Sequence, residues 1–233
     1  MLSLSTYTIS TMLTLSTPVR MLGAMPSTPA RRARARKKAY HHGDLERALV
    51  DTALQTIQDE GVQGLTLRNV GARVGVSRTA LYRHFDGKAA LIARVAEEGF
   101  RRFHTMLTAA RAKAAKTGAD ALPAMSAAYV RFAHAHPSHY QTMFGGFLTD
   151  WSPYPDLVER AEAAFDVLAD AIREEQRNDR LAAGDPIELA EMVWSMCHGI
   201  ATLGMAKLLG RTPTAADDLA QIAARIFQNG MKP

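Results

Sequence analysis

The stretch TLRNVGARVGVSRTALYRHF, residues 66–85, constrains the fold more than any other part of the chain. Thr66 and Ser77 are residue types that cap helix N-termini, and each stands directly before a run that favours a helix. Gly75 lies between the two runs, where the chain needs a residue with a left-handed backbone. Two short helices joined by a tight glycine turn form the helix-turn-helix arrangement.

A third helix is predicted before this pair. Asp44 is its expected N-cap, and the helix should end near Gly61. Its apolar positions recur with helical spacing and form one face, made of Leu45, Leu49, Ala53 and Ile57. Three short helices therefore make one small unit at the front of the chain.

Beyond this unit the pattern changes to long helices. Residues 88–118 are predicted to form one helix of about 45 Å that ends at Gly118. A helix of this length usually links two parts of a molecule. Ile92, Val95, Phe103 and Leu107 line it.

The remaining residues continue the helical pattern. Four more helix starts are predicted from cap residues and capping-box spacing: Asp120; Asp156 with Glu159; Asp185 with Pro186 and Glu188; and Thr214 with Asp217. The last helix should end at Gly230. No segment shows the alternation of a strand, so we predict an all-α fold.

Charge is distributed unevenly along the chain. Residues 1–90 hold 13 Lys and Arg against 6 Asp and Glu, a net charge of +7, whereas residues 91–233 hold 15 against 17, a net charge of −2. Six basic residues fall within positions 31–38. This run is either a solvated tail or an arm attracted to phosphate, and its place just before the short helices favours the arm.

The cysteine content and the hydropathy of the chain indicate the cellular compartment in which the protein is expected to act. Cys197 is the only cysteine, which excludes an internal disulfide and makes a cytoplasmic protein the default. No apolar run reaches the roughly 18 residues of a membrane span. Residues 1–39 are predicted to be a disordered basic extension without the features of a secretory signal, and Met12, Met21 and Met25 leave open a later translation start.

The helix that begins at Arg78 has two different faces. At 100° per residue, Leu81 and Phe85 fall together and should face the first helix. A recognition helix enters the major groove N-terminus first, so Arg78, Thr79 and Ala80 are predicted to meet base edges. The predicted DNA-binding residues, with Ser77 as the cap and the others suited to phosphate, are Arg68, Ser77, Arg78, Thr79, Ala80, Tyr82, Arg83, His84 and Lys88.

Neither a catalytic pair nor a metal site is predicted from the polar residues of this chain. A Ser77–His84 catalytic pair fails, because two helical turns place the residues about 10 Å apart along the axis. His134, His136 and His139 are close in sequence, but Pro137 breaks the helix between them, so we expect no metal site. We expect neither a cofactor nor enzymatic activity.

Residues 44–92, and above all GVSRTALYRHF followed by Lys88, resemble the DNA-binding region of the TetR family of bacterial transcription regulators. The resemblance implies a homodimeric, ligand-responsive repressor that acts on the bacterial nucleoid. Trp194, His198 and Gly199 resemble the Trp–His–Gly signature of one C-terminal subclass. Gly71 departs from the usual alanine, at a helix-propensity cost of about 1 kcal/mol, and Asn69 replaces the acidic residue of a capping box.

The expected domains follow from these observations: residues 1–39 as the extension, 40–88 as the helix-turn-helix DNA-binding domain, and 89–233 as a helical effector-binding and dimerisation domain. The helix over residues 185–208 is apolar on nearly every side, so one face should cover the interior and another a partner subunit. Together with residues 214–229 it suits a four-helix dimer interface, as in the family resembled.

Aromatic residues and Met of the C-terminal part either fill the core or line an apolar effector pocket, and the sequence leaves both open. No carboxylate or arginine cluster marks a charged effector, which favours an apolar or aromatic, uncharged small molecule. The pocket candidates are Phe103, Tyr129, Phe132, Tyr140, Met143, Phe144, Phe147, Phe165, Trp194 and His198. Tyr129, Tyr140, Trp194 and His198 are favoured, because each has a polar atom that needs a partner when buried.

The leading hypothesis is thus a ligand-controlled repressor that binds a pseudo-palindromic site in double-stranded DNA. Competing hypotheses are an activator, a DNA-organising protein without an effector, and an enzyme whose N-terminal helices are incidental. The missing catalytic constellation argues against the enzyme.

Deleting residues 1–38 should weaken DNA binding on all sequences and flatten the dependence of the association constant on salt, because up to six cationic side chains would no longer displace counterions. Salt titration of DNA binding by the full and shortened chains measures this. An unchanged slope would mean that the basic run makes no phosphate contact.

Overall fold

A computed structural model describes residues 42–210 and 212–232. These residues form nine α-helices and no strand, which confirms the all-α prediction. None of the helices in this part of the chain is both long and apolar enough to cross a membrane. The helices are α1 (His42–Gly64), α2 (Leu67–Val74), α3 (Arg78–Tyr82), α4 (Gly87–Thr117), α5 (Ala121–Ala135), α6 (Pro137–Phe144), α7 (Pro155–Arg177), α8 (Pro186–Met205) and α9 (Pro213–Gly230).

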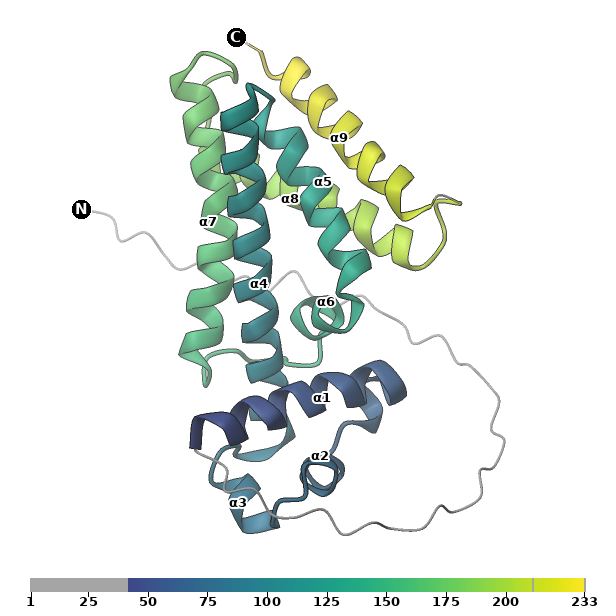
Figure 1. Cartoon of the computed structure of the whole chain (residues 1–233). Coiled ribbons are helices and arrows are strands. Elements are labelled where there is room, and N and C mark those ends of the chain that lie inside the picture. Colours follow the sequence, from purple (N-terminus) through teal and green to yellow (C-terminus); the bar gives the residue numbers. More distant parts are fainter. Residues whose placement is uncertain (1–41, 211, 233) are drawn as a thin grey trace, which may run out of the picture.

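The first three helices lie at one end of the molecule, and α4 rises from them into a bundle with α5 to α9 (Figure 1). The predicted extension over residues 1–39, with its basic run, lies outside the described residues. α6 contacts both α1 and α4, so it lies at the junction of the two parts.

α1 to α3 enclose their own apolar core. The predicted apolar face of the first helix is confirmed, since Leu49, Ala53 and Ile57 are buried there. Leu81 and Phe85 are buried in the same core, as the helical spacing predicts. The first turns of α4 complete this core with Leu91, Ile92 and Val95.

A larger core fills the bundle. α4 contributes Phe100, Phe103 and Leu107. α5 and α7 pack against α4, and α8 packs against α5 and α7. α4 has 31 residues and ends at Gly118, whose backbone φ of 69° is left-handed. The long linking helix predicted from the sequence is therefore confirmed, and the same helix takes part in both cores.

Two predicted capping boxes are wrong. α7 begins at Pro155 and α9 at Pro213, so Asp156 and Thr214 lie inside the first turn. Proline has no N–H to satisfy and its fixed φ suits the first helical position, so the cap is the residue before it. At α9 this residue is Thr212, whose Oγ1 accepts a hydrogen bond from the Ala215 N–H at 3.3 Å.

The same rule places the cap of α8 correctly. Asp185 precedes Pro186, and its Oδ1 accepts a hydrogen bond from the Ile187 N–H at 2.8 Å. The helix ends at Met205 and not at 208, because Lys207 has a left-handed φ of 60°. α1 begins at His42, so Asp44 lies in its first turn and is not the N-cap. The expected end near Gly61 corresponds to a break, since Gly61 has a non-helical φ of 71°.

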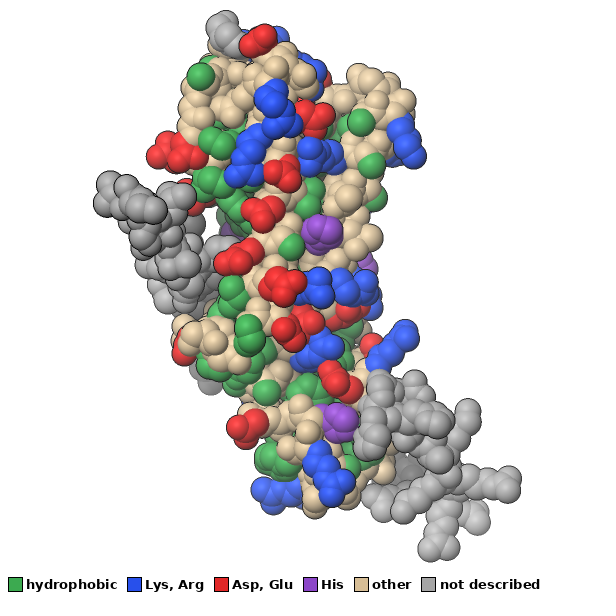
Figure 2. All heavy atoms as spheres, turned by 90° about the vertical axis from the view of Figure 1, so that its left-hand side faces the viewer, with side chains coloured by type: hydrophobic (Ala, Val, Ile, Leu, Met, Phe, Trp, Pro, Cys, Tyr) green, Lys and Arg blue, Asp and Glu red, His purple; other side chains and the backbone are tan. Residues whose placement is uncertain are grey.

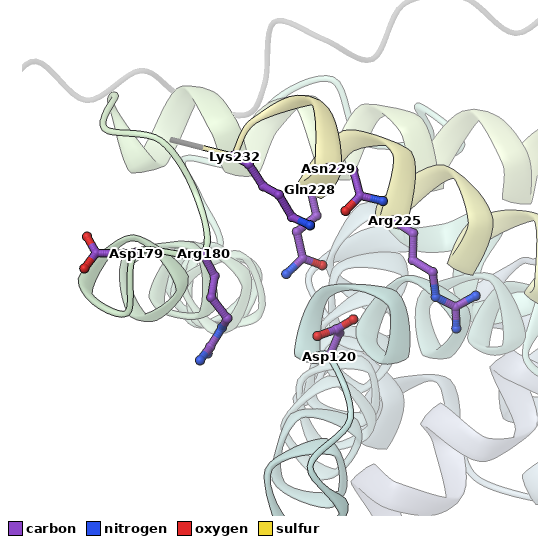
Figure 3. A pocket seen from close by; sticks show the side chains of 7 residues that line it. All are labelled: Asp120, Asp179, Arg180, Arg225, Gln228, Asn229 and Lys232. Carbon is purple, nitrogen blue, oxygen red and sulfur yellow. The ribbon is translucent and has the colours of Figure 1, made fainter.

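The far end of the bundle is held by a buried carboxylate. Glu175 of α7 is only 3% exposed and accepts two hydrogen bonds from Arg180, both at 2.7 Å, and one from Gln228 of α9 at 3.1 Å. Arg180 and Gln228 point into an open hollow of about 620 Å³ between α5, α7 and α9 (Figure 3). These bonds join the last helix to α7.

Replacing Arg180 with Ala should lower the free energy of unfolding by about 1–3 kcal/mol, because it leaves a buried carboxylate with one neutral partner. This is less than the cost of breaking a fully buried pair, since Arg180 is half exposed. Urea unfolding at one protein concentration measures it. The control is Arg173→Ala, which removes an exposed pair with Asp170 and should cost under about 0.5 kcal/mol. Equal costs would contradict the role of Glu175.

Candidate nucleic-acid interface and aromatic interior

The turn between α2 and α3 is fixed by the predicted caps. Thr66 Oγ1 accepts a hydrogen bond from the Asn69 N–H at 3.1 Å, and Ser77 Oγ accepts one from the Ala80 N–H at 3.2 Å. Gly75 has a φ of 78° and donates its N–H to the Gly71 carbonyl at 2.9 Å. The prediction that Ser77 is a helix cap is confirmed. The Ser77 hydroxyl oxygen therefore stabilises the first turn of α3.

Gly71 has a packing role that the sequence did not reveal. A Cβ on this buried residue would lie 2.8 Å from Leu81 Cδ1, closer than two carbon atoms can approach. The glycine thus lies in close contact with Leu81 of α3. An alanine at this position would require the Leu81 methyl group to shift.

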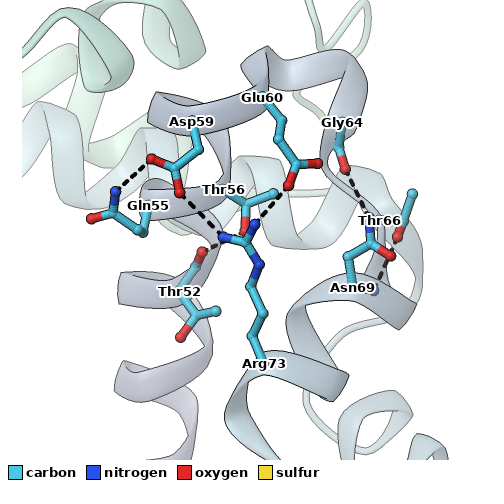
Figure 4. Close-up of polar contacts among 9 residues, drawn as sticks. All are labelled: Thr52, Gln55, Thr56, Asp59, Glu60, Gly64, Thr66, Asn69 and Arg73. Atoms are coloured by element: carbon cyan, nitrogen blue, oxygen red, sulfur yellow. Dashed lines mark hydrogen bonds and ion pairs between the residues drawn. The ribbon is translucent and has the colours of Figure 1, made fainter. Parts of the chain in front are cut away.

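Polar side chains fasten α2 to the end of α1 (Figure 4). The Arg73 guanidinium bridges Glu60 Oε1 at 2.6 Å and Asp59 Oδ2 at 3.4 Å. Asn69 donates from Nδ2 to the Gly64 carbonyl at 3.3 Å, so this residue makes a different bond in place of the missing capping box. Together these contacts hold α2, and through it α3, in one orientation.

The residues predicted to contact DNA lie mainly on the surface of this unit. Basic side chains appear at this lower end of the face in Figure 2, below a line of acidic side chains. Tyr82 is 48% exposed. The exposed members are Arg68, Ser77, Arg78, Thr79, Tyr82 and Arg83, whereas Ala80, His84 and Lys88 are half-buried.

α3 is shorter than predicted and ends at Tyr82, although the Phe85 N–H still donates to the Leu81 carbonyl at 3.1 Å. The Arg78 guanidinium lies over the Tyr82 ring, 5.3 Å from its centroid. A cation–π contact of this kind restricts the guanidinium to one side of the helix. Lys88 donates from Nζ to the Val62 carbonyl at 2.8 Å, which leaves part of its donor capacity for another partner.

Eight of the ten pocket candidates form one network of ring contacts in the bundle. Trp194 of α8 is at its centre, with ring centroids 5.4 Å from Tyr129 and 5.5 Å from Phe165. Most of the contacts are edge-to-face, the favourable geometry for aromatic pairs. The eight residues are Phe103, Tyr129, Phe132, Tyr140, Phe144, Phe165, Trp194 and His198.

The other two candidates lie elsewhere. Met143 is buried against Gly99 of α4, where a Cβ would lie 2.7 Å from its sulfur. Phe147 is 36% exposed, beside Gly145. Sequence spacing could not separate these two residues from the rest, because Tyr140 and Phe144 of the same segment do belong to the network.

Three polar groups meet inside the network. The hydroxyl oxygens of Tyr129 and Tyr140 lie 3.0 and 2.8 Å from His198 Nδ1. Burial lowers the pKa of His198, and it raises that of Tyr140 to about 12 and that of Tyr129 well above its usual value. Burial thus favours the neutral imidazole, in which one ring nitrogen donates and the other accepts, so Nδ1 has a single role to share between the two hydroxyl groups. Tyr129, Tyr140 and His198 were each expected to need a hydrogen-bond partner when buried, and they serve as partners for one another.

A small cavity lies beside Tyr129 and Trp194, and several of the residues that line it were not predicted from the sequence. The cavity has a volume of about 10 Å³, and its other lining residues come from α4, α5, α7 and α8: Leu107, Met125, Ser126, Leu168, Val193 and Cys197. Burial raises the pKa of the Cys197 thiol to about 11, so the thiol is neutral. Ser126 could have been noticed as the one hydroxyl on the apolar face of its helix, three residues before Tyr129.

The clustered histidines do not come together as metal ligands. His134 Nδ1 bonds the Val130 carbonyl at 3.0 Å, and the rings of His136 and His139 pack edge to face. Within residues 42–210 and 212–232 there is no group of three His, Cys, Asp or Glu side chains that could hold a metal ion.

α8 and α9 present large apolar side chains to solvent. Ile226 of α9 is 68% exposed, and Ile222 of α9 and Met192 and Leu203 of α8 are exposed as well, as is Leu208 in the turn after α8. The predicted apolar helix is thus buried on one face only. Its other face carries exposed apolar side chains, as does α9, the helix that packs against it.

Comparison with known proteins identifies both parts of the chain. Residues 49–95 match the model of bacterial regulatory proteins of the tetR family, and residues 122–227 match that of the tetracyclin repressor-like C-terminal domain. The description of the second model names no Trp–His–Gly signature, so that subclass stays a prediction.

Curated relatives are similar over part of their length. The chain is 43% identical over 61 residues to the tetracycline repressor protein class C of Escherichia coli, covering 26% of this chain and 28% of that protein. It is 28% identical over 99 residues to the uncharacterized HTH-type transcriptional regulator YobS of Bacillus subtilis (strain 168), covering 42% and 51%. The chain thus spans about a quarter to a half of these relatives.

A solved structure extends the similarity over both parts. A protein of unknown function from Rhodococcus sp. RHA1 is 32% identical with a TM-score of 0.73, covering 84% of this chain and 100% of that one. The chain belongs to the TetR family of bacterial regulatory proteins.

Proposed function

We propose that the protein is a sequence-specific DNA-binding transcription regulator, which acts in the bacterial cytoplasm as a homodimeric repressor. The observation that carries this proposal is the two-sided character of α3. Leu81 and Phe85 anchor the helix, while Arg78 and Thr79 remain exposed at its N-terminal tip. A helix held in this way can enter a major groove tip first.

The reading residues are Arg78, Thr79 and Ala80. An arginine can bond guanine O6 and N7 together, and the methyl groups of Thr and Ala suit the thymine methyl. Arg68, Tyr82, Arg83, His84 and Lys88 serve the phosphates, which set position without reading sequence. We propose residues 40–88 as the DNA-binding domain and 89–233 as the effector-binding and dimerisation domain.

The dimer forms through α8 and α9. Support comes from the exposed apolar side chains Met192 and Leu203 of α8 and Ile222 and Ile226 of α9, two helices that pack together, and a two-fold axis would pair these helices with their copies. The dimer would place two α3 helices about 34–36 Å apart, one turn of DNA, so the operator should be pseudo-palindromic.

The effector is an apolar or aromatic, uncharged small molecule that binds within the ring network and releases the operator. Support comes from α4, whose side chains line the network and also complete the core around α1 to α3. An effector that prefers another position of α4 would change the spacing of the two reading helices. It can do so only by its difference in affinity for the two arrangements.

The name of the curated E. coli relative, a tetracycline repressor, supports repression here. A regulator without an effector, or one that activates, remains the alternative. Selection of bound DNA from a random pool tests the proposal, followed by a screen for compounds that abolish binding. A protein that only organises DNA by charge would show no preferred site at any salt concentration.

Arg78→Ala should weaken binding to the selected site by about 1–3 kcal/mol and relax one base preference, because the bidentate contact to one base pair is lost. Titration against the site and its single-base variants measures both effects. Arg68→Ala is the matched control and should weaken all sequences alike. An equal loss on every sequence for Arg78→Ala would contradict its reading role.

Ile226→Asp should convert the dimer to monomer. The dimer would lose about 3 kcal/mol or more, because two copies of a buried isoleucine are each worth about 1.5 kcal/mol or more. Sedimentation velocity over a range of concentrations measures this. Ala109→Asp, at an exposed position of α4, is the control and should leave the dimer intact. Dimers that persist in Ile226→Asp would place the interface elsewhere.

A further inference from the structure

Ser126 is an unusual polar residue in the interior of the bundle. It is 2% exposed, and its Oγ has no partner at full hydrogen-bond geometry among the described residues, although it lies close enough to the Cys197 thiol to oppose the rise in the pKa of that group. A buried hydroxyl without a partner is a costly feature that native proteins seldom keep. This hydroxyl therefore needs an explanation.

Other hydroxyls in the helices of this protein find a partner locally. Thr105, Thr117 and Thr142 each donate to the carbonyl four residues earlier, at 2.9, 3.1 and 3.0 Å. This is the usual way for a helical Ser or Thr to satisfy its hydroxyl. Ser126 does not use it, and lines the small cavity between α4, α5, α7 and α8.

A buried water is a poor explanation. The cavity of about 10 Å³ is at the lower limit of room for one water, which needs two to four polar partners. The Tyr129 hydroxyl is already bonded to His198, and the Cys197 thiol is a weak partner. Among the residues that line this space, the Ser126 hydroxyl and the Trp194 indole N–H are the strong hydrogen-bonding groups not bonded to another described residue, and only the Ser126 hydroxyl can accept as well as donate.

The remaining walls of the cavity define what could bind there. They are the apolar side chains of Leu107, Leu168 and Val193 and the rings of Tyr129 and Trp194. No carboxylate, ammonium or guanidinium group lines the cavity, so a charged ligand would be buried unpaired at a high cost. The lining favours an uncharged molecule with aromatic surface and one polar group.

We propose that Ser126 is the hydrogen-bonding residue of the effector site, and that the effector is an uncharged, largely aromatic molecule with a single hydroxyl or carbonyl group that bonds Ser126 Oγ. This rests on the proposed function, because it assumes that an effector binds in the bundle. A cavity for one benzene ring is roughly 150 Å³, so the effector must move the walls. One wall is Leu107 of α4, the helix that reaches the DNA-binding unit.

The test compares two probes that differ by one hydroxyl, 2-naphthol and naphthalene. Calorimetric titration of the full chain gives the ratio of their dissociation constants for the wild type, for Ser126→Ala and for Thr108→Ala, an exposed hydroxyl on α4. The preference for 2-naphthol should fall by about 2- to 13-fold in Ser126→Ala, the value of one neutral hydrogen bond. It should not change in Thr108→Ala.

Thermal unfolding without a probe is the second measurement. Ser126→Ala should raise the unfolding temperature at least as much as Thr108→Ala, because it removes an unpartnered buried hydroxyl as well as improving helix propensity. A lower unfolding temperature would show that the hydroxyl is bonded in the folded chain, and would overturn the proposal.

Two calorimetric results would also overturn it: no binding of either probe to the wild type, or a 2-naphthol preference that survives in Ser126→Ala. DNA binding to a site selected from a random pool is measured separately, without a probe. A failure of the proposed function is therefore told apart from a failure of the Ser126 proposal.

Discussion

The packing of α4 into two cores is the constraint on which the rest of the structure depends. Leu91, Ile92 and Val95 close the core of α1 to α3, while Phe100 and Phe103 belong to the bundle. Polar contacts reinforce the first attachment, since Lys88 bonds the Val62 carbonyl and Arg94 bonds Glu46 of α1 at 2.7 Å. Because close-packed interiors transmit small displacements, this double packing is the structural basis for the proposed effect of an effector on the position of α3.

Most of the buried polar groups named in the bundle have hydrogen-bond partners. Glu175 is held by Arg180 and Gln228, and His198 is held by two tyrosine hydroxyls. These satisfied groups fix the positions of the helices that bear them. Ser126 is different because it is buried without such a partner, and this difference separates a residue that holds the fold from one available to a ligand.

Much of the fold could be predicted from local chemistry. Thr66, Gly75 and Ser77 fixed the short helices because a cap or a left-handed glycine acts within a few residues. The boxes at Asp156 and Thr214 failed for an equally local reason, since a neighbouring proline begins each helix earlier. The close contact of Gly71 with Leu81 could not be predicted in this way, because Leu81 lies ten residues later on another helix.

The sequence by itself determined the all-helical class, the helix-turn-helix and the apolar and polar faces of α3, since periodicity and capping depend on near neighbours. Only the tertiary structure decided which aromatic residues meet, that Phe147 stays at the surface, and that Ser126 faces a cavity. Such placements depend on how α4, α5, α7 and α8 cross. A crossing is set by the packing of side chains far apart in the chain, which no local pattern records.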